Sequence, residues 1–195
     1  MPRSLTWPLC VVALCALMPV TQAATPGKHA PAKHQPAQGV AVSLLKGALR
    51  FTLPSGYKSE PLPPGDASTG TAGAKGTLYM NDAQKRIVVT TELPIQGDAP
   101  VAADSSFLAG ASAGFISKQA QALPDFHSTQ QQPVTLHGVP AQRIDATATV
   151  GGGSTLNTYF IAAQGQQLAV VQVISRISDK AGHDAAVKRL ATAQR

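Results

Sequence analysis

A serine between two glycines, followed later by an acid and a histidine, is the pattern in this chain that could do chemistry. Gly110-Ala111-Ser112-Ala113-Gly114 matches the Gly-x-Ser-x-Gly nucleophile elbow. Asp145 and His183 follow in the chain order that α/β-hydrolases use. In those enzymes a tight strand-to-helix turn exposes the serine, and the histidine takes its proton. One hypothesis is therefore a small serine hydrolase.

The sequence around this serine favours a structural role. The motif lies between Val101 and Leu123, where Phe107, Ala111 and Phe115 recur every four residues, as on one face of a helix. No His-Gly-Gly-type oxyanion loop precedes it, and the chain is short for a hydrolase fold. Small residues at this spacing would let a helix approach a sheet closely. We therefore expect no catalytic residues and no enzymatic activity.

Two other patterns resemble binding sites only in part. Gly151-Gly152-Gly153 has the composition of a phosphate loop, but a strand pattern follows it where a phosphate cradle needs a helix start. A hairpin loop is the expected structure. His127, His137 and His183 fall on separate elements without metal-ligand spacing. We expect each at a strand end or on a helix surface, with no metal site and no cofactor.

Asp145 lies inside a clear strand pattern. Arg143 lies two residues away and shares its face of the strand, so a surface ion pair accounts for both residues. The other carboxylates are scattered, and they suggest no acid–base pair.

The net positive charge does not indicate nucleic-acid binding. Of 16 Lys and Arg, against 10 Asp and Glu, Arg3, Lys28 and Lys33 precede the region with a folding pattern. The remainder contains no run longer than two basic residues, as in Lys85-Arg86 and Lys188-Arg189. Phosphate-backbone recognition needs a clustered stripe, often with stacking aromatic residues. The mild excess of positive charge would favour anionic envelope polymers or lipids.

The first 23 residues read as an export signal. Arg3 supplies a positive start, Leu9 to Met18 form an apolar run, and small residues end at Ala23. The apolar run is about half the length that a membrane span needs. We therefore expect cleavage between Ala23 and Ala24, delivery to the periplasm or the exterior, and no transmembrane segment in the mature chain.

Cysteine usage agrees with this prediction. Cys10 and Cys15 both lie inside the signal, so the mature chain has no cysteine and must be stabilised by packing alone. Lipidation at Cys15 is the alternative, but Leu14 stands where a lipobox needs a small residue.

Residues 24–39 predict a disordered linker, because they contain three prolines and no large apolar side chain. Its two Lys-His pairs, Lys28-His29 and Lys33-His34, could bind copper or zinc weakly or serve only as a solvated tether. Residues 40–195 then form a single domain.

The periodicity of this domain alternates between strands and helices. Its predicted strands are 49–53, 78–81, 85–93, 126–136, 142–150, 155–163 and 168–175, and its predicted helices span 101–123 and the residues after Asp179. A Gly- and Pro-rich surface loop is expected over 60–76. In the last helix His183, Val187 and Leu190 fall on one side. This order predicts an α+β fold, in which two helices bury their apolar stripes on an antiparallel sheet.

Three stretches resemble a known family. Residues 42–54, Val-Ser-Leu-Leu-Lys-Gly-Ala-Leu-Arg-Phe-Thr-Leu-Pro, are similar to the opening of DcrB-type envelope proteins. Residues 135–138 before a Gln-Arg-Ile-Asp strand, and residues 165–168 before residues 170–173, resemble the final hairpins of that family. The resemblance spans roughly residues 42 to 193.

The resemblance implies a PsbP-like α/β/α sandwich, a curved antiparallel sheet with helices on both sides. DcrB-type proteins are periplasmic or associated with the inner membrane, contribute to envelope integrity and are linked to phage entry. Cytoplasmic relatives act as chaperones for apolar segments of secreted toxins. Several members are lipoproteins, and this chain departs from them in lacking a lipobox.

Three functional hypotheses follow from the sequence. The first is an exported, non-catalytic envelope protein that binds another envelope protein. The second is a carrier or chaperone for an apolar ligand or peptide, and the third is the serine hydrolase.

Overall fold

The structure is a computed structural model that describes residues 38–67, 71–97 and 103–192. The predicted signal peptide, its cleavage site between Ala23 and Ala24, both cysteines and both Lys-His pairs lie outside the described residues, as does the predicted linker up to residue 37. No helix in the described ranges combines the length and the hydropathy needed to cross a bilayer.

The framework is a seven-stranded antiparallel sheet in the order β3-β4-β5-β9-β8-β7-β6. Short turns join most of the strands that are consecutive in the chain, as two-residue hairpins such as Gly151-Gly152 between β7 and β8. The strands are β3 (Lys58–Pro61), β4 (Lys75–Asn81), β5 (Arg86–Pro94), β6 (His127–Leu136), β7 (Val139–Val150), β8 (Gly153–Gln164) and β9 (Gln167–Arg176).

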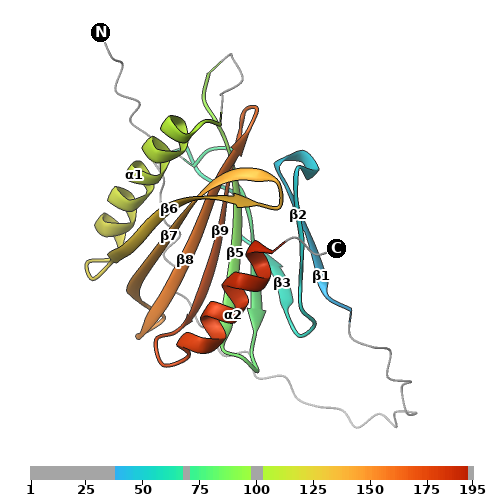
Figure 1. Cartoon of the computed structure of the whole chain (residues 1–195), viewed down its shortest axis with the longest axis vertical. Coiled ribbons are helices and arrows are strands. Elements are labelled where there is room, and N and C mark those ends of the chain that lie inside the picture. The colour runs from blue at the N-terminus through green and yellow to red at the C-terminus, as the bar shows by residue number, and fades with distance from the viewer. Residues whose placement is uncertain (1–37, 68–70, 98–102, 193–195) are drawn as a thin grey trace.

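The two helices cover opposite faces of this sheet (Figure 1). α1 (Ser105–Ala122) packs on β6, β7 and β8, and α2 (Lys180–Ala191) packs mainly on β9. Both helices are capped by an aspartate, which the sequence predicted for α2, whereas α1 was expected to begin at residue 101. Asp104 accepts a hydrogen bond from the Phe107 amide at 2.8 Å, and Asp179 accepts one from Gly182 at 3.1 Å.

A separate two-stranded hairpin lies beside α2 on the same face of the sheet. It consists of β1 (Val40–Leu44), a short 3-10 turn η1 (Leu45–Gly47) and β2 (Leu49–Leu53). The hairpin belongs to its own sheet, so side-chain burial attaches it rather than a strand ladder. Each of its buried large side chains contributes about 2 kcal/mol. They are Val42, Leu44, Leu45, Leu49, Phe51 and Leu53.

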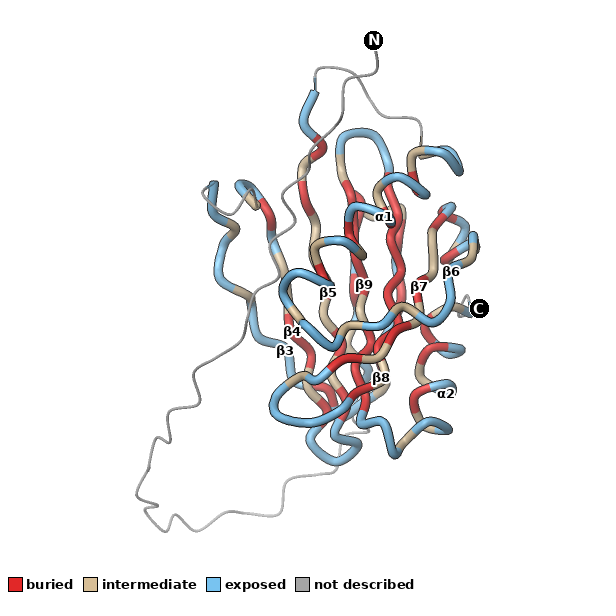
Figure 2. The backbone as a smooth tube through the Cα atoms, turned by 90° about the vertical axis from the view of Figure 1, so that its left-hand side faces the viewer, coloured by how far each residue is buried: buried red, intermediate tan, exposed pale blue. Residues whose placement is uncertain are grey.

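The sheet divides the interior into two apolar clusters (Figure 2). Phe160, Val171 and Val173 face α2 and the hairpin, whereas Ile144 and Tyr159 face α1. The predicted α+β fold, an antiparallel sheet with a helix on each side, is therefore confirmed.

The sequence prediction missed two N-terminal strands. No strand was predicted over β1 or β3, although the domain was expected to begin at residue 40, where β1 begins. All four residues of β3 are exposed, so it carries no apolar alternation. In β5, Val88 is buried under the α2 face, whereas Ile87 and Val89 on the opposite face are only half-buried because α1 lies over the other end of the sheet.

Candidate functional site

The sheet keeps the predicted serine apart from the acid and the histidine. Ser112 lies on the face of α1 that packs against the sheet, and its side chain is fully buried. Its Oγ has no hydrogen-bond partner among the described residues. Asp145 alternates with Ile144 on β7 and so points to the α2 face, where His183 is located. The three residues of the hydrolase pattern are therefore not brought together.

The small residues around Ser112 do not act as the sequence suggested. Gly110 and Gly114 lie on the exposed side of α1, and a Cβ atom at either position would meet no heavy atom within 4 Å. Of Gly110, Ser112 and Gly114, only Ser112 faces the sheet. The expectation that small residues let this helix approach the sheet closely therefore applies to the serine alone.

Asp145 and His183 belong instead to a buried chain of hydrogen bonds under α2. The Thr158 Oγ1 lies 2.6 Å from Asp145 Oδ1 and 2.9 Å from His183 Nε2. The His183 Nδ1 lies 3.0 Å from Ser175 Oγ, which accepts a bond from Arg86 Nε at 3.1 Å. We call this chain the α2 relay. It joins strands β5, β9, β8 and β7 to the first turn of α2.

Donor and acceptor roles fix the direction of every proton in the relay. A carboxylate only accepts, so the Thr158 hydroxyl donates to Asp145 and must itself accept from His183 Nε2–H. The Nδ1 of a neutral histidine then accepts from the Ser175 hydroxyl, whose oxygen is free to accept from Arg86. This neutral form, which the lowered pKa of His183 favours, is held at both nitrogens, and neither nitrogen is available to activate a nucleophile.

The charges at the two ends of the relay are also paired. Arg143 forms an ion pair with Asp145 at 3.0 Å, as predicted, but both side chains are mostly buried rather than on the surface. At the other end Arg86 contacts Asp179 at 2.6 Å and Gln84 at 2.7 Å. Every nitrogen of the Arg86 guanidinium therefore donates to a partner, which is what a buried cation requires.

The structure buries His183, which was expected at a strand end or on a helix surface. It does fall on the same side of α2 as Val187 and Leu190, as predicted, but that side is buried and His183 is only 5% exposed. Burial lowers the pKa of His183 below its usual value of 6.5, partly opposed by the nearby carboxylates Asp184 and Asp145. The imidazole is thereby kept in the neutral form that the relay needs.

His137 has a separate structural role at the tip of the β6–β7 hairpin, where the sequence predicted a turn. It adopts a left-handed conformation with φ of 49°, stacks on Phe51 at 5.9 Å and lies 2.6 Å from the Leu190 carbonyl oxygen. It therefore ties the β1–β2 hairpin to the last turn of α2. His127 lies exposed at the start of β6, at the opposite end of that strand from His137. No group of three metal-ligating side chains occurs in residues 38–67, 71–97 and 103–192.

Beside the relay, a groove of about 450 Å³ lies between the β1–β2 hairpin, β5, β9 and α2. We call it the α2 groove. Its floor is largely apolar. Its polar groups are Tyr57, Arg189 and the Arg86–Asp179 ion pair, with Thr52 and Gln84 beside them. Burial raises the pKa of Tyr57, with the positive charge of Arg86 opposing the shift. The apolar lining comes from Leu53, Pro54, Val88, Val173, Ala186 and Leu190.

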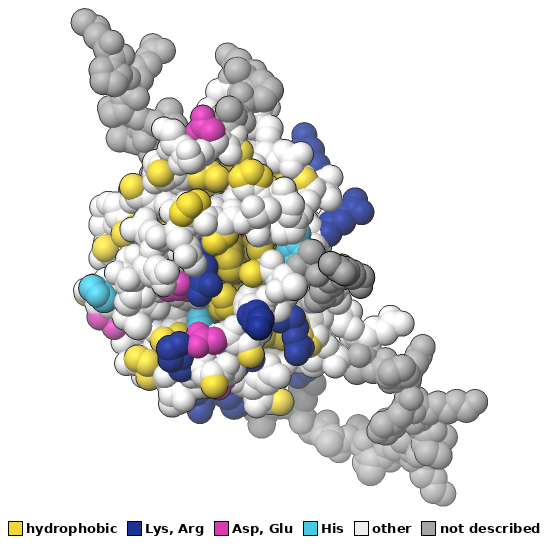
Figure 3. Space-filling model, viewed as in Figure 1, with side chains coloured by type: hydrophobic (Ala, Val, Ile, Leu, Met, Phe, Trp, Pro, Cys, Tyr) yellow, Lys and Arg dark blue, Asp and Glu magenta, His cyan; other side chains and the backbone are white. Residues whose placement is uncertain are grey.

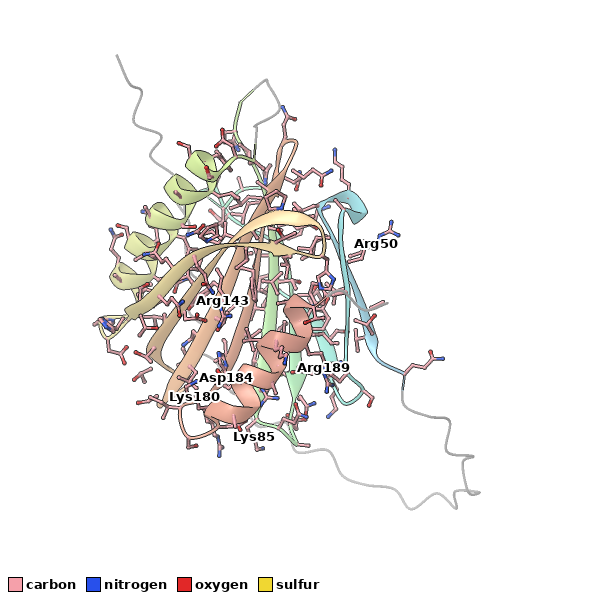
Figure 4. The ribbon with its side chains drawn as sticks, in the orientation of Figure 1. Arg50, Lys85, Arg143, Lys180, Asp184 and Arg189 are labelled. Carbon is pink, nitrogen blue, oxygen red and sulfur yellow. The ribbon has the colours of Figure 1, made fainter. Side chains whose placement is uncertain are left out.

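The rim of the α2 groove carries positive charge. Arg189 stands on α2 next to the hairpin (Figure 4) and makes no ion pair in the described part of the chain. On the face shown in Figure 3, hydrophobic side chains are visible between Lys and Arg side chains. An apolar floor with a cationic rim suits an apolar group that carries a polar or anionic end.

Sequence reasoning found two members of the relay and missed the other three. Arg86, Thr158 and Ser175 lie on three different strands, and only the strand register places their side chains together. One local signal was present. A Cβ atom at Gly182 would collide with Asp179 and Arg86, so this glycine in the first turn of α2 marks their close approach.

Comparison with known proteins shows the fold of this chain. No protein-family model and no curated protein matches the sequence. Among solved structures, the cyanobacterial PsbP protein CyanoP from Synechocystis sp. PCC 6803 is similar with a TM-score of 0.59 and 10% identity, over 84% of this chain and 95% of that chain. The chain therefore has a PsbP-like fold.

Two further structures are similar at lower scores. PA94 from Pseudomonas aeruginosa matches with a TM-score of 0.45 and 15% identity, over 81% of this chain and 98% of that chain. LpqN, a protein involved in cell envelope biogenesis of Mycobacterium tuberculosis, matches with a TM-score of 0.44 and 12% identity, over 81% of this chain and 83% of that chain.

Proposed function

We propose that this chain is an exported, non-catalytic envelope protein of DcrB type, which acts by binding another envelope protein. The observation that carries the proposal is the α2 groove, a hollow of about 450 Å³ with an apolar floor and a cationic rim. A volume of this size accommodates an apolar side chain and its neighbouring backbone. We assign the groove to an apolar segment of the partner.

The chemistry of the site supports binding rather than catalysis. Both nitrogens of His183 and the Thr158 hydroxyl are used within the relay, and Ser112 lies on the other side of the sheet. A nucleophile needs a base within hydrogen-bond reach. A fluorophosphonate probe should leave Ser112 unlabelled, and labelling would restore the hydrolase hypothesis.

The envelope location is supported by the leader. An apolar run of about ten residues with a small-residue end at Ala23 is typical of a cleaved signal. The PsbP-like fold agrees with the DcrB resemblance of residues 42–54, which form β1, η1 and β2. Mass spectrometry of the mature protein should give an N-terminus at Ala24 in the periplasmic or secreted fraction.

Crosslinking in the intact envelope tests the partner. Ala185 is exposed on α2 and lines the groove, whereas Ala120 is exposed on α1. Ala185→Trp should fill the groove and abolish co-purification of a specific crosslinked partner, while Ala120→Trp should leave it unchanged. Equal capture by both variants, or recovery of the chain without any partner, would contradict the proposal.

A second candidate function is a carrier for an apolar ligand or peptide, because the floor of the same groove is built from large apolar side chains such as Leu53, Val88 and Leu190. Native mass spectrometry of the protein purified from the envelope fraction distinguishes the two. A retained lipid or peptide that Ala185→Trp displaces would favour the carrier.

A further inference from the structure

A second groove lies at the other end of β2 and β5 and has a different character. We call it the basic groove. It measures about 460 Å³ and is formed where the β1–β2 connection meets the starts of β4 and β9 and the end of β5. Its lining includes Lys46, Arg50, Lys75, Glu92 and Gln167. Three cations from three separate elements thus face one hollow that contains one carboxylate.

The cations of the basic groove have no protein partner. Lys46, Arg50 and Lys75 are exposed and take part in no ion pair or side-chain hydrogen bond in the described ranges. Arg50 lies on β2 at the outer edge of the molecule (Figure 4). By contrast, the Glu92 carboxylate is already occupied, because its Oε1 accepts the Leu45 amide at 2.6 Å. The groove therefore has an uncompensated positive charge.

The backbone that presents Lys46 adopts an uncommon conformation. Leu45, Lys46 and Gly47 are three consecutive residues with positive φ, at 53°, 55° and 90°. Residues other than glycine rarely adopt a positive φ, and those that do concentrate at functional sites. The hydrogen bond from Leu45 to Glu92 and the burial of the Leu45 side chain hold the turn in place.

Gly47 also makes room for Arg50. A Cβ atom at position 47 would lie 2.6 Å from the nearest guanidinium nitrogen of Arg50. The glycine therefore allows the guanidinium to lie against the turn, next to Lys46. Two independent features, the Glu92 clamp and the missing Cβ, thus place two cations at one edge of the groove, with Lys75 across from them.

We propose that the basic groove binds a phosphate group through Lys46, Arg50 and Lys75. A phosphate presents three or more acceptor oxygens, which suits three cationic donors that line one groove from separate elements, and an arginine fork can bind two of these oxygens. The Gln167 side chain adds a neutral donor. The proposal is separate from the partner site in the α2 groove, and either one can hold without the other.

The first test measures inorganic phosphate binding by NMR titration of backbone amides at low salt. Shifts should concentrate at residues 43–50 and around Lys75 and Gln167, and each of Lys46→Gln, Arg50→Gln and Lys75→Gln should weaken binding about tenfold, because a hydrogen bond to a charged group is lost. Binding should weaken with added sodium chloride, because salt screens exposed charges.

The control variant has the same net charge as the triple groove variant, in which Lys46, Arg50 and Lys75 are all replaced by glutamine. Lys85→Gln, Lys118→Gln and Arg176→Gln together remove three cations that lie outside the groove. Phosphate affinity should stay within about twofold of the wild type for this control and should be lost in the triple groove variant. Equal losses in both triple variants, or no localised shifts, would overturn the proposal.

A gain-of-affinity variant separates binding from folding. Glu92→Gln retains an oxygen that can accept the Leu45 amide but removes the one negative charge from the groove. It should bind phosphate about fivefold more tightly, since a like charge near the anion is removed. Unchanged or weaker binding, with the fold intact by circular dichroism, would contradict the assignment.

Vesicles then identify the source of the phosphate group. Phosphatidylglycerol vesicles should retain the wild-type protein and the control triple variant but release the groove triple variant if a lipid headgroup is the ligand. Retention on phosphatidylcholine is not expected. Phosphate binding in solution without groove-dependent vesicle retention would assign the groove to a soluble phosphate compound. The absence of both would overturn the proposal.

Discussion

The α2 groove and the basic groove lie at opposite ends of β2 and β5, and each contains an arginine from one of these strands. Arg86 in the α2 groove is 6% exposed and donates to Ser175, Gln84 and Asp179. Arg50 in the basic groove is exposed and has no such partners in the described residues. The same type of side chain therefore has a structural role in the α2 groove and keeps its donors available for a ligand in the basic groove.

The difference shows that the surroundings of a charge decide its role. A cation whose donors are all used can position the elements around it, and Arg86 does this for the first turn of α2. A cation without partners keeps its donors for a ligand and contributes little to folding. Substitution of each arginine should separate the two roles.

The largest expected effect is that of Arg86→Ala. It removes the three hydrogen bonds of a buried cation, to Ser175, Gln84 and Asp179, and should lower the free energy of unfolding by about 3 kcal/mol. Arg50→Ala, the matched control, should change it by less than about 0.5 kcal/mol. Urea unfolding measures both, and similar losses for the two variants would erase the contrast between the grooves.

Removal of the hydroxyl in the middle of the relay should have the next largest effect. Thr158→Val removes one of the donors to Asp145, which keeps Arg143, and leaves His183 Nε2–H without an acceptor, at a cost of about 2 kcal/mol. Thr158→Ser retains the hydroxyl and should cost about 1 kcal/mol or less, for the lost methyl group alone. If Val and Ser cost the same, the hydrogen bonds of the relay contribute nothing.

The relay should also make stability depend on pH. Because burial lowers the pKa of His183 in the folded chain, the unfolded chain binds a proton more readily just below 6.5. The contribution of His183 is complete above pH 6.5 and decreases as the pH falls below that value. His183→Gln, which keeps one donor and one acceptor, should remove this part of the slope. An unchanged slope in that variant would assign it to other groups.

The smallest expected effect concerns the opposite face of the sheet. Ser112→Ala removes a buried hydroxyl that has no partner in the described part of the chain, so stability should stay constant or rise by up to about 1 kcal/mol. Thermal unfolding measures the change. A clear loss of stability would reveal a hydrogen bond of Ser112 and would weaken the contrast with the relay.

Local patterns in the sequence were sufficient for most of the fold. The four-residue recurrence of Phe107, Ala111 and Phe115 predicted α1, although from residue 101 rather than Ser105, and Asp179 marked the start of α2. β3 escaped prediction because edge strands need no apolar alternation. The resemblance to DcrB-type proteins anticipated the PsbP-like fold that the structural comparison shows.

Neither the α2 relay nor the basic groove could be predicted in the same way. Arg86, Ser175 and Thr158 come together only through the register of β5, β9 and β8. Lys75 and Lys46 line the same groove only because the β1–β2 hairpin packs on the main sheet, with which it forms no strand pairing. Long-range pairing of this kind leaves no signal at a fixed spacing in the sequence, apart from Gly47 and Gly182, whose missing side chains mark close approaches.

The most direct test of the central claim, that the α2 groove binds a partner protein, is site-specific photo-crosslinking in the intact envelope. A photoreactive residue at position 185 on the groove wall should give one discrete crosslinked species, whereas the same residue at position 120 on α1 should give none. No crosslink from position 185, or the same species from both positions, would contradict the account.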